Sequence, residues 1–482
     1  MFTSSTREIG IDLKTAFAFF GIFCLLVFFH GLGTGTLPLI DRDEPIFAEA
    51  SREMIERGDW IVPYFNEAPL FHKPPLFYWA QTLSYRLLGE DERSARLPSV
   101  LAASFLGLVI LVFGSQLYDR RTGFCAAAVF SLSLHTMLLA KAATMDMVMV
   151  LFVTLAVWAG WALYGTEESR NRALAWSLFY GSLALGFLAK GPAAGLPLVM
   201  RVPQKRRGLV IGVLLAASIV GLWGVPALLR TGGEFFRVGI GEHIVGRSVG
   251  VMEGHGASSI LSYILTLPFY FLTVFISFAP WSWFLPAAVA YYTKPGHRTV
   301  KEKYLLSGVA IVFVVFSLIR TKLPHYTFPA FPLLSLLFAH FWSEQKKDFR
   351  IIRAMAAVTA AVFAIGAIFL FPRLAPYSPA GELFNQSRHL LTPQMEFASV
   401  DYQEPSLVWS FRKIVNGFHH ALERSQVADF MMREGPRFCI LPAADFAVIE
   451  HRLDPRWEKV RHRGFNIANG NWVELVLVVK RE

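Results

Sequence analysis

The chain has 482 residues, of which 54% are hydrophobic and 17% charged, with a net charge of +10. The hydrophobic share exceeds the roughly 45–50% of an ordinary globular domain, and the mean hydropathy of +0.43 argues against a soluble protein. Apolar runs at 16–30, 97–114 and 208–229 approach the ~20 residues that cross a hydrocarbon layer. These runs predict a polytopic membrane protein.

Eleven apolar stretches are candidate membrane spans. The first is longer than a signal-peptide core and no small-residue cleavage site follows it, so we interpret it as a retained span. The basic clusters lie in short loops, as the positive-inside rule requires of cytoplasmic loops, and the net charge therefore does not indicate nucleic acid binding. Eleven crossings place the C-terminus outside. The predicted spans are 13–33, 95–116, 122–140, 147–165, 173–190, 191–203, 208–229, 270–292, 304–320, 325–342 and 351–372.

Two segments are expected outside the bilayer. We predict a membrane-embedded domain at 1–372, whose first outer loop at 34–96 carries two helices along the membrane surface, and a soluble α/β domain at 373–482. The first loop helix is expected to begin near Pro45 and to stop at Gly58. Its apolar residues share one face, as in a helix that lies along the membrane surface. The second follows Pro74 and ends at Gly89, with aromatic residues suited to the headgroup level.

In the C-terminal segment, residues 406–410, 438–441 and 472–479 are predicted strands and residues 421–433 a helix. The third strand follows an Asn469-Gly470 turn signal. Three cysteines, Cys24, Cys125 and Cys439, do not suggest a disulfide framework, and we expect free thiols.

Several charged residues lie at the outer ends of the predicted spans, where lysine is depleted. Lysines beside carboxylates at the outer headgroup level suit an anionic lipid phosphate, and a neighbouring carboxylate could take a proton from an incoming hydroxyl. The alternatives are that Asp43 only caps the helix at Pro45 and that the lysines snorkel from span ends. The residues are Asp43, Glu44, Lys73, Lys141, Asp146, Lys190, Arg320 and Lys322.

Two histidines at outer positions, His72 and His243, lack the spacing of metal ligands, so we predict no metal site and no required cofactor. His325 and Tyr326 begin a predicted span, where an interfacial aromatic belt also accounts for them.

The outer-loop residues resemble a known family. Asp43-Glu44-Pro45, Lys73-Pro74-Pro75 and Arg96-Leu97-Pro98-Ser99 resemble the first outer loop of bacterial glycosyltransferases of the aminoarabinose transferase and protein mannosyltransferase superfamily. Two later motifs match in the right order, Lys190-Gly191-Pro192 and Lys322-Leu323-Pro324-His325-Tyr326. The likeness covers about residues 35–345.

This resemblance implies a mainly α, membrane-embedded fold of the GT-C type in the bacterial inner membrane. It implies a polyprenyl-phosphate sugar donor and transfer on the periplasmic side to lipid A, another envelope glycan or a protein. By motif position, Asp43 is the expected catalytic carboxylate, with Glu44 beside it. The donor phosphate is expected at Lys73, Lys190 and Lys322 with Arg320 and Tyr326, and the pocket is completed by His72, Lys141, Asp146 and His243.

The residue chemistry agrees with that implication. The leaving phosphate needs its growing charge neutralised, which lysines in a water-poor site can do without a metal. A single displacement at the anomeric carbon predicts inversion of configuration. Ile46 and His72 depart from residues that many relatives carry, and the aminoarabinose transferases are longer at the C-terminus, so the sugar and the acceptor stay open. A transporter or flippase is the alternative, but such proteins place charges near the midplane and show repeated halves. An inactive scaffold is a third reading.

Overall fold

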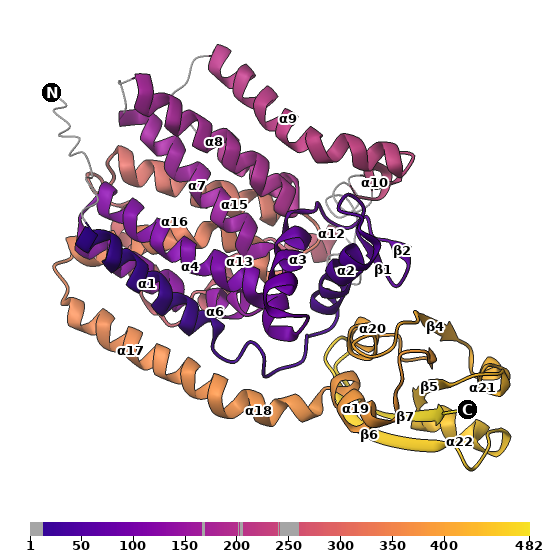
Figure 1. Ribbon diagram of the computed structural model, residues 1–482. Helices are drawn as coiled ribbons and strands as arrows, with labels where there is room; N and C mark the ends of the chain where they lie inside the picture. The colour runs from indigo at the N-terminus through magenta and orange to yellow at the C-terminus, as the bar shows by residue number, and fades with distance from the viewer. Residues whose placement is uncertain (1–12, 166–168, 201, 203–205, 240, 242–259) are drawn as a thin grey trace. The chain divides into compact units, whose positions relative to one another are not determined.

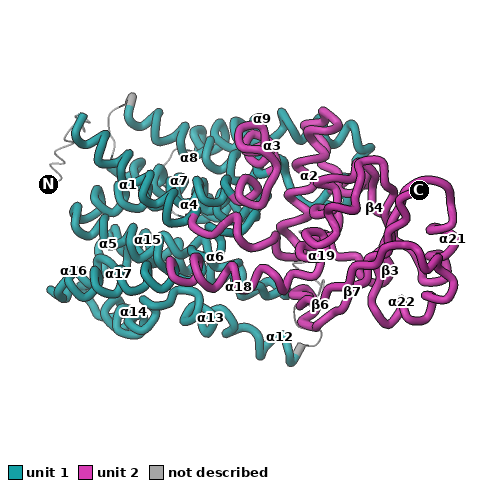
Figure 2. The backbone as a smooth tube through the Cα atoms, turned by 60° about the horizontal axis from the view of Figure 1, so that its bottom comes forward, with its two compact units in different colours: residues 1–31, 71–77, 97–363 teal, residues 32–70, 78–96, 364–482 magenta. Residues whose placement is uncertain are grey.

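The computed structural model describes residues 13–165, 169–200, 202, 206–239, 241 and 260–482. Their contacts divide the chain into two compact units, shown in teal and magenta in Figure 2. Unit 1 comprises residues 1–31, 71–77 and 97–363, and unit 2 comprises residues 32–70, 78–96 and 364–482. The first outer loop, predicted as part of the membrane domain, thus clusters mostly with the C-terminal residues.

Unit 1 is helical throughout its described part (Figure 1). Its longest helices are apolar along most of their length, as helices in a lipid environment must be, because their backbone polar groups are satisfied internally. The elements in chain order are α1 (Leu13–Gly31), α4 (Glu92–Leu117, which begins in unit 2), α5 (Arg120–Ser131), α6 (Leu134–Ala140), α7 (Asp146–Gly165), α8 (Ser169–Lys190), η1 (Pro192–Val199), α9 (Arg206–Arg230), α10 (Glu234–Phe236), α12 (Ile260–Thr266), α13 (Phe269–Ser277), η3 (Trp281–Phe284), α14 (Leu285–Thr293), α15 (Val300–Leu318), η4 (Pro324–Ala330), α16 (Phe331–Glu344) and α17 (Phe349–Ile365, which ends in unit 2).

Helix α7 packs against α8, α8 against α9, and α5 against α16. Small residues also permit close approaches between helices of this unit, as is common where helices meet in a membrane. Gly114 of α4 and Gly123 of α5 meet backbone to backbone, and a Cβ added at Gly114 would lie 2.9 Å from the Gly123 Cα. Gly212 of α9 lies against the ring of Tyr180 of α8, which is fully buried.

Six helices of the described part are long and apolar enough to cross a membrane, and two bent helix pairs raise the number to eight. The chain is therefore an integral membrane protein, but the predicted total of eleven spans is not confirmed. The prediction of a span at 191–203 is wrong, since η1 is an eight-residue 3-10 helix. At ~2 Å per residue it covers only about half of the ~30 Å hydrocarbon layer. The predicted span at 122–140 is two helices, α5 and α6, bent by 65°.

Unit 2 contains both predicted loop helices. Helix α2 (Asp43–Arg57) ends at Gly58, which has φ +65°, a left-handed conformation that glycine adopts without strain. A short hairpin follows, formed by β1 (Tyr64–Phe65) and β2 (Ala68–Pro69), and α3 (Leu76–Leu88, which begins in unit 1) comes next. The predicted ends of both helices at glycine are confirmed, but the predicted cap at the start of α2 is absent, because the N-cap position is Arg42 and makes no side-chain cap.

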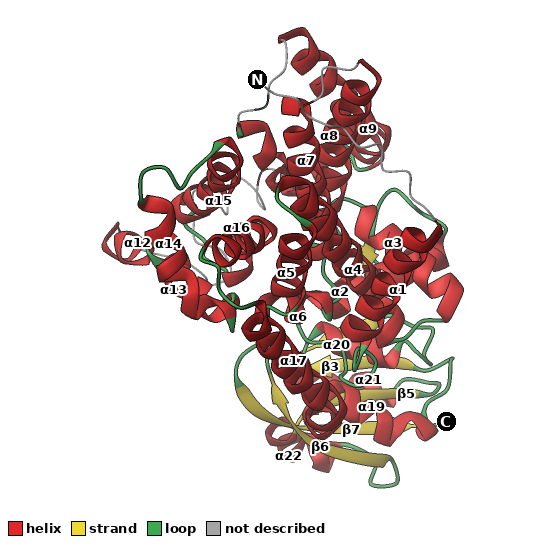
Figure 3. Ribbon diagram, turned by 90° about the vertical axis from the view of Figure 1, so that its left-hand side faces the viewer, coloured by secondary structure: helices red, strands yellow, loops and turns green. Residues whose placement is uncertain are grey.

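The C-terminal part of unit 2 is a five-stranded sheet with helices on both faces, as Figure 3 shows. The strand order is β4-β3-β5-β7-β6, with β4, β3 and β5 parallel and β7 antiparallel to both β5 and β6. The elements are η5 (Gly366–Leu370), α18 (Phe371–Leu374), η6 (Ala375–Tyr377), α19 (Pro379–Ser387), η7 (Arg388–Leu390), β3 (Glu396–Val400), α20 (Pro405–Phe411), β4 (His419–Leu422), η8 (Arg424–Gln426), α21 (Val427–Met432), β5 (Arg437–Pro442), α22 (Ala443–Ile449), η9 (Glu450–Arg452), β6 (Glu458–Asn466) and β7 (Asn471–Lys480).

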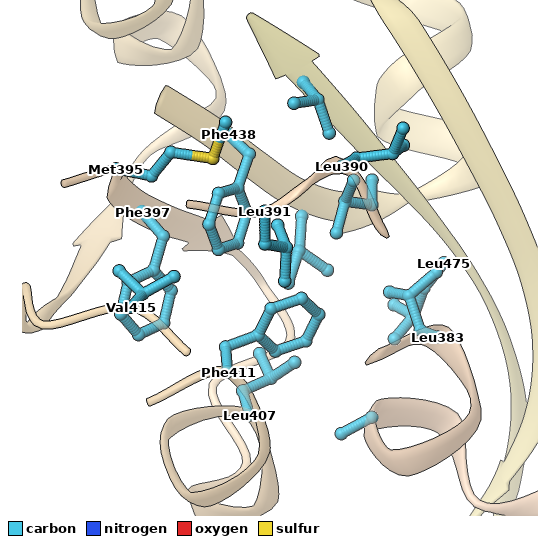
Figure 4. Close-up of a cluster of buried hydrophobic side chains, with 14 of the residues drawn as sticks. Leu383, Leu390, Leu391, Met395, Phe397, Leu407, Phe411, Val415, Phe438 and Leu475 are labelled. Carbon is cyan, nitrogen blue, oxygen red and sulfur yellow. The ribbon is translucent and has the colours of Figure 1, made fainter. Parts of the chain in front are cut away.

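Alternating residues of the strands build one apolar core on each face. Phe397, Phe438 and Leu475 point to the face covered by α19 and α20, where Phe411 packs against them (Figure 4). The opposite residues of the same strands pack under α21 and α22, with Cys439 among them. The period-two alternation of a strand thus buries both faces of this sheet.

Two of the three predicted strands in this segment are confirmed, as β5 and β7, and the turn at Asn469-Gly470 is present with Gly470 at φ +73°. The predicted strand at 406–410 is wrong, because these residues form α20, whose residues from Ser406 to Phe411 are all buried. A helix buried on every side lacks the polar face that would reveal its period. The predicted helix at 421–433 is only partly correct, since it contains the end of β4 and only its second half is α21.

Candidate functional site

Two helix ends meet at a buried ion pair in unit 1. Asp146, the first residue of α7, pairs with the amino group of Lys190, the last residue of α8. The side chains are 8% and 16% exposed. His325 and Lys73 also interact electrostatically with this carboxylate. The structure thus brings together Lys73, Asp146 and Lys190, as predicted. It adds His325, for which the sequence predicts a position at the membrane interface.

An apolar cavity of about 620 Å³ lies in the same unit. Its walls come from α8, η1, α9 and α10 and are mostly alanine, leucine, valine, phenylalanine and glycine. His72, Lys73 and Lys190 are among its lining residues. Gly191, at φ +88°, turns the chain from α8 into η1 immediately after Lys190. The cavity therefore combines apolar walls with a small group of cationic and imidazole side chains.

Lys322 is not among the residues that line this cavity. Its amino group donates to the carbonyl oxygens of Phe316 (3.2 Å), Ser317 (2.5 Å) and Ile319, at the C-terminal end of α15. An ammonium group has three N–H donors, so these bonds account for all of them. In this arrangement Lys322 caps a helix, which replaces the predicted contact with a phosphate.

The two other residues predicted near Lys322 for the donor phosphate, Arg320 and Tyr326, also have different neighbours. Arg320 is exposed and its guanidinium lies 5.9 Å from the Tyr263 ring, while the Tyr326 ring lies 5.3 Å from that of Phe316. Neither lines the cavity.

Lys141 likewise supports a helix end. Its amino group donates to the carbonyl oxygens of Phe29 (3.2 Å) and His30 (2.7 Å) near the C-terminus of α1. Cations stabilise helix C-termini by offsetting the partial negative charge of the last carbonyls. The predicted role of Lys141 in the pocket is therefore replaced by a structural one. His243, also predicted for the pocket, lies outside the described residues.

The predicted carboxylate pair lies in unit 2 and its two members differ. Asp43 is exposed at the first residue of α2, and among the described residues its carboxylate has no hydrogen-bond or ion-pair partner. Tyr78, fully buried with an unpartnered hydroxyl, interacts with it electrostatically. This exposure leaves Asp43 available to a substrate.

Glu44 is buried and fully engaged. Both of its carboxylate oxygens accept from the guanidinium of Arg96, at 2.9 and 2.7 Å, and one also accepts from the Ile40 backbone N–H at 2.8 Å. The same guanidinium donates to the carbonyl oxygens of Thr34 and Leu37, at 2.6 and 2.7 Å. Glu44 thus anchors the loop before α2, and this replaces its predicted catalytic role.

Arg96 was not predicted as a site residue, although it stands in the quoted Arg-Leu-Pro-Ser motif. The sequence does not predict the partner of this arginine, because Glu44 lies 52 positions earlier in the chain. Among the described residues no group of three or more histidine, cysteine, aspartate or glutamate side chains could hold a metal ion.

Comparison with known proteins gives sequence and structural relatives. A family model for dolichyl-phosphate-mannose-protein mannosyltransferase matches residues 72–223. The undecaprenyl phosphate-alpha-4-amino-4-deoxy-L-arabinose arabinosyl transferase of Pectobacterium atrosepticum is 30% identical over 323 residues, which are 63% of this chain and 56% of the relative. An uncharacterized protein of Aquifex aeolicus is 25% identical over 364 residues, 72% of this chain and 68% of that protein. The matched region thus spans little more than half the length of the arabinosyl transferase.

Among solved structures, the ArnT of Cupriavidus metallidurans bound to undecaprenyl phosphate superposes with a TM-score of 0.75 and 17% identity, over 97% of this chain and 98% of that chain. The oligosaccharyltransferase AglB of Archaeoglobus fulgidus superposes with a TM-score of 0.52 and 11% identity, over 92% of this chain and 71% of that chain.

These likenesses confirm the predicted fold class: a helical, membrane-embedded fold of the GT-C type with a small C-terminal sheet domain. Within that class the chain is similar to the aminoarabinose transferases and matches the protein mannosyltransferase model over residues 72–223, so the predicted resemblance to this superfamily is confirmed as well.

Proposed function

We propose that the protein is an inverting glycosyltransferase, which moves a sugar from a polyprenyl-phosphate donor to an acceptor on the periplasmic side of a bacterial inner membrane. The acceptor classes are lipid A, another envelope glycan and a protein. The observation that carries the proposal is the apolar cavity of about 620 Å³ with Lys73, Lys190 and His72 among its lining residues. A polyprenyl chain requires apolar walls, and its phosphate requires cations.

In this proposal the two lysines bind the donor phosphate. The ion pair with Asp146 fixes the Lys190 amino group. This amino group is largely shielded from water, so its attraction to an anion is stronger than it would be at the surface. As the bond to the sugar breaks, the leaving phosphate gains negative charge, which Lys73 and Lys190 neutralise. A phosphate is a good leaving group under these conditions, so the step requires no metal.

Asp43 is the proposed base. It is an exposed carboxylate without a hydrogen-bond or ion-pair partner among the described residues, so it can accept the proton of an acceptor hydroxyl as that oxygen attacks the anomeric carbon. If the acceptor is a phosphate, which is already anionic, Asp43 orients it instead. One displacement from the side opposite the leaving phosphate inverts the anomeric configuration.

The relatives support this assignment by their names and titles. One relative is an arabinosyl transferase acting with undecaprenyl phosphate aminoarabinose, and the ArnT structure holds undecaprenyl phosphate. A transporter remains the alternative class, but no feature of the described residues favours it over a transferase.

The test is reconstitution of the purified protein in liposomes with polyprenyl-phosphate sugars and candidate acceptors. We expect transfer by the wild type, its loss in Asp43→Asn, and unchanged binding of undecaprenyl phosphate in that variant. Lys73→Ala should lose both transfer and lipid-phosphate binding, whereas Lys303→Ala, an exposed lysine of α15, should lose neither. Transfer that persists in Asp43→Asn, or equal losses of binding in Lys73→Ala and Lys303→Ala, would contradict the assignment.

A further inference from the structure

A carboxylate two residues before Asp43 binds the C-terminal sheet domain. One oxygen of Asp41 accepts from the backbone N–H of Ser406 at 2.8 Å, and the other accepts from the Ser406 hydroxyl at 2.6 Å. Ser406 lies at the start of α20, 365 residues further along the chain, and both residues belong to unit 2. We refer to this pair of hydrogen bonds as the Asp41–Ser406 contact.

The contact lies at a particular edge of the sheet. The helices that follow the adjacent parallel strands β3 and β5 cover opposite faces, α20 on one and α22 on the other. In open α/β sheets the carboxyl ends of strands arranged in this way form a crevice where ligands bind. Here the chain's own Asp41 lies at that edge. The next residue, Arg42, donates to the carbonyl oxygen of Ala468 in the turn between β6 and β7, at 3.1 Å.

Helix α2 is held by the same domain beyond its first turn. Arg412, which follows α20, forms ion pairs with Glu49 and with Glu56, the latter at 2.7 Å. The guanidinium of Arg52 lies 4.1 Å from the Trp409 ring and donates to the Trp409 carbonyl oxygen at 3.3 Å. Glu49 and Arg52 are both buried. The helix that begins with Asp43 is therefore fixed to α20 along one side.

We infer that the C-terminal sheet domain positions the Asp43 carboxylate, with Asp41 and Ser406 as the positioning residues. The inference rests on the proposed function, in which Asp43 is the base. A base must lie within hydrogen-bond reach of the proton that it accepts, and a displacement of about 1 Å can cost 10²-fold in rate. The Asp43 side chain is exposed and has no hydrogen-bond or ion-pair partner among the residues that the structure describes, so the residues that precede it and the side of α2 must fix its place.

The charges around Asp41 give the contact a pH dependence. Glu404, in the loop before α20, and Glu44 of α2 act on it, and Tyr402 lies near enough to interact with it. Burial raises the pKa of the Asp41 carboxyl to about 7, the two glutamates add to the rise, and the Ser406 hydrogen bonds oppose it. Because the buried carboxyl holds its proton more tightly than a solvated one, burial of Asp41 at this contact becomes less favourable as the pH rises from about 4 to about 7.

The test compares two serine-to-alanine variants of the same domain. Ser406→Ala removes one bond of the contact, and Ser387→Ala removes a buried hydroxyl that donates to carbonyl oxygens within α19. Amide hydrogen exchange of residues 38–47, measured on the full-length protein, should become faster in Ser406→Ala and stay unchanged in Ser387→Ala. In the transfer assay kcat should fall about 10- to 100-fold in Ser406→Ala alone, with undecaprenyl phosphate binding unchanged.

Asp41→Asn is the conservative variant: its amide oxygen can accept from the Ser406 N–H, its NH2 group can donate to the Ser406 hydroxyl oxygen, and it carries no charge. It should retain most of the wild-type kcat and lose the inflection near pH 7 that is expected of the wild type. Equal exchange in Ser406→Ala and Ser387→Ala, or an unchanged kcat in Ser406→Ala, would overturn the inference. A wild type without transfer activity would instead overturn the proposed function, and the exchange experiment would still decide whether the domain fixes residues 38–47.

Discussion

The carboxylate of Asp146 is paired with the amino group of Lys190, so the first residue of α7 is tied to the last residue of α8. Both groups are largely shielded from solvent. Removing one partner of such a pair leaves the other as an uncompensated buried charge, which costs more than the pair itself contributes.

The first prediction separates the structural role of Lys190 from its proposed role in binding phosphate. Lys190→Ala should destabilise the protein by about 3–5 kcal/mol, because Asp146 is left unpaired. Adding Asp146→Asn should restore most of this stability, because the orphan charge is gone, without restoring undecaprenyl phosphate binding. Thermal unfolding in detergent and a lipid-phosphate binding assay measure the two effects. Recovery of binding in the double variant would show that Lys190 acts only through Asp146.

The second prediction concerns Arg96, whose guanidinium holds Glu44 and the loop before α2. Arg96→Ala should cost about 3–5 kcal/mol, since it leaves the Glu44 carboxylate buried without its cation. Arg96→Lys should rescue little, because an ammonium cannot reproduce the bidentate fork. Arg456→Ala is the control: its ion pair with Asp454 is exposed at the arginine, and surface pairs contribute at most ~1 kcal/mol. Similar melting temperatures for Arg96→Ala and Arg456→Ala would contradict the prediction.

The third prediction follows from the raised pKa of Asp41. The pKa is about 7 in the folded protein and near 4 in an unfolded chain, so between these values the folded state binds more protons. The contribution of Asp41 to stability is therefore largest at low pH and is lost as the pH rises from about 4 to about 7. Asp41→Asn cannot titrate, so relative to wild type its melting temperature should be higher at pH 8 than at pH 5. A difference that is the same at both pH values would show that burial does not govern this carboxyl.

The fourth prediction uses two glycines of α9. A Cβ at Gly212 would overlap the ring of Tyr180, which is fully buried and lines the cavity, whereas a Cβ at Gly224 meets nothing within 4 Å. Gly212→Ala should lower stability, since overpacking typically costs about 1–3 kcal/mol. Gly224→Ala should be neutral or slightly stabilising, because alanine favours the helix by roughly 1 kcal/mol. Thermal unfolding distinguishes them, and equal melting temperatures would show that Tyr180 moves aside freely.

Local signals predicted much of the fold. Gly58 and Gly89 marked helix ends correctly, since both adopt positive φ, and the turn signal at Asn469-Gly470 marked the start of β7. The sequence failed where burial is complete or where partners are distant. Helix α20 has no polar face to reveal its period, and the short apolar stretch at 191–203 lacks the length that separates a span from a turn.

The candidate site shows the same limits. The grouping of Lys73, Asp146 and Lys190 was predictable, because charges at the outer ends of apolar spans are rare and tend to gather. The roles of Lys141 and Lys322 were not, since a sequence does not show which helix carbonyls a lysine reaches. For Glu44 and Arg96, motif membership identified the residues but not their pairing. The convergence of Asp43 with the lysines stays a prediction.

The strand order of the C-terminal sheet has a consequence for biosynthesis. Strand β7 follows β6 in the chain yet lies between β5 and β6, so β6 has no partner in this sheet until β7 has been made. Helix α2 is synthesised more than 300 residues before α20, so its Arg52 has no contact with Trp409 until α20 is made. At about 5–20 residues per second this interval lasts on the order of tens of seconds. A chain whose synthesis stalls before β7 would therefore have its membrane helices made while β6 lacks its partner strand in the sheet.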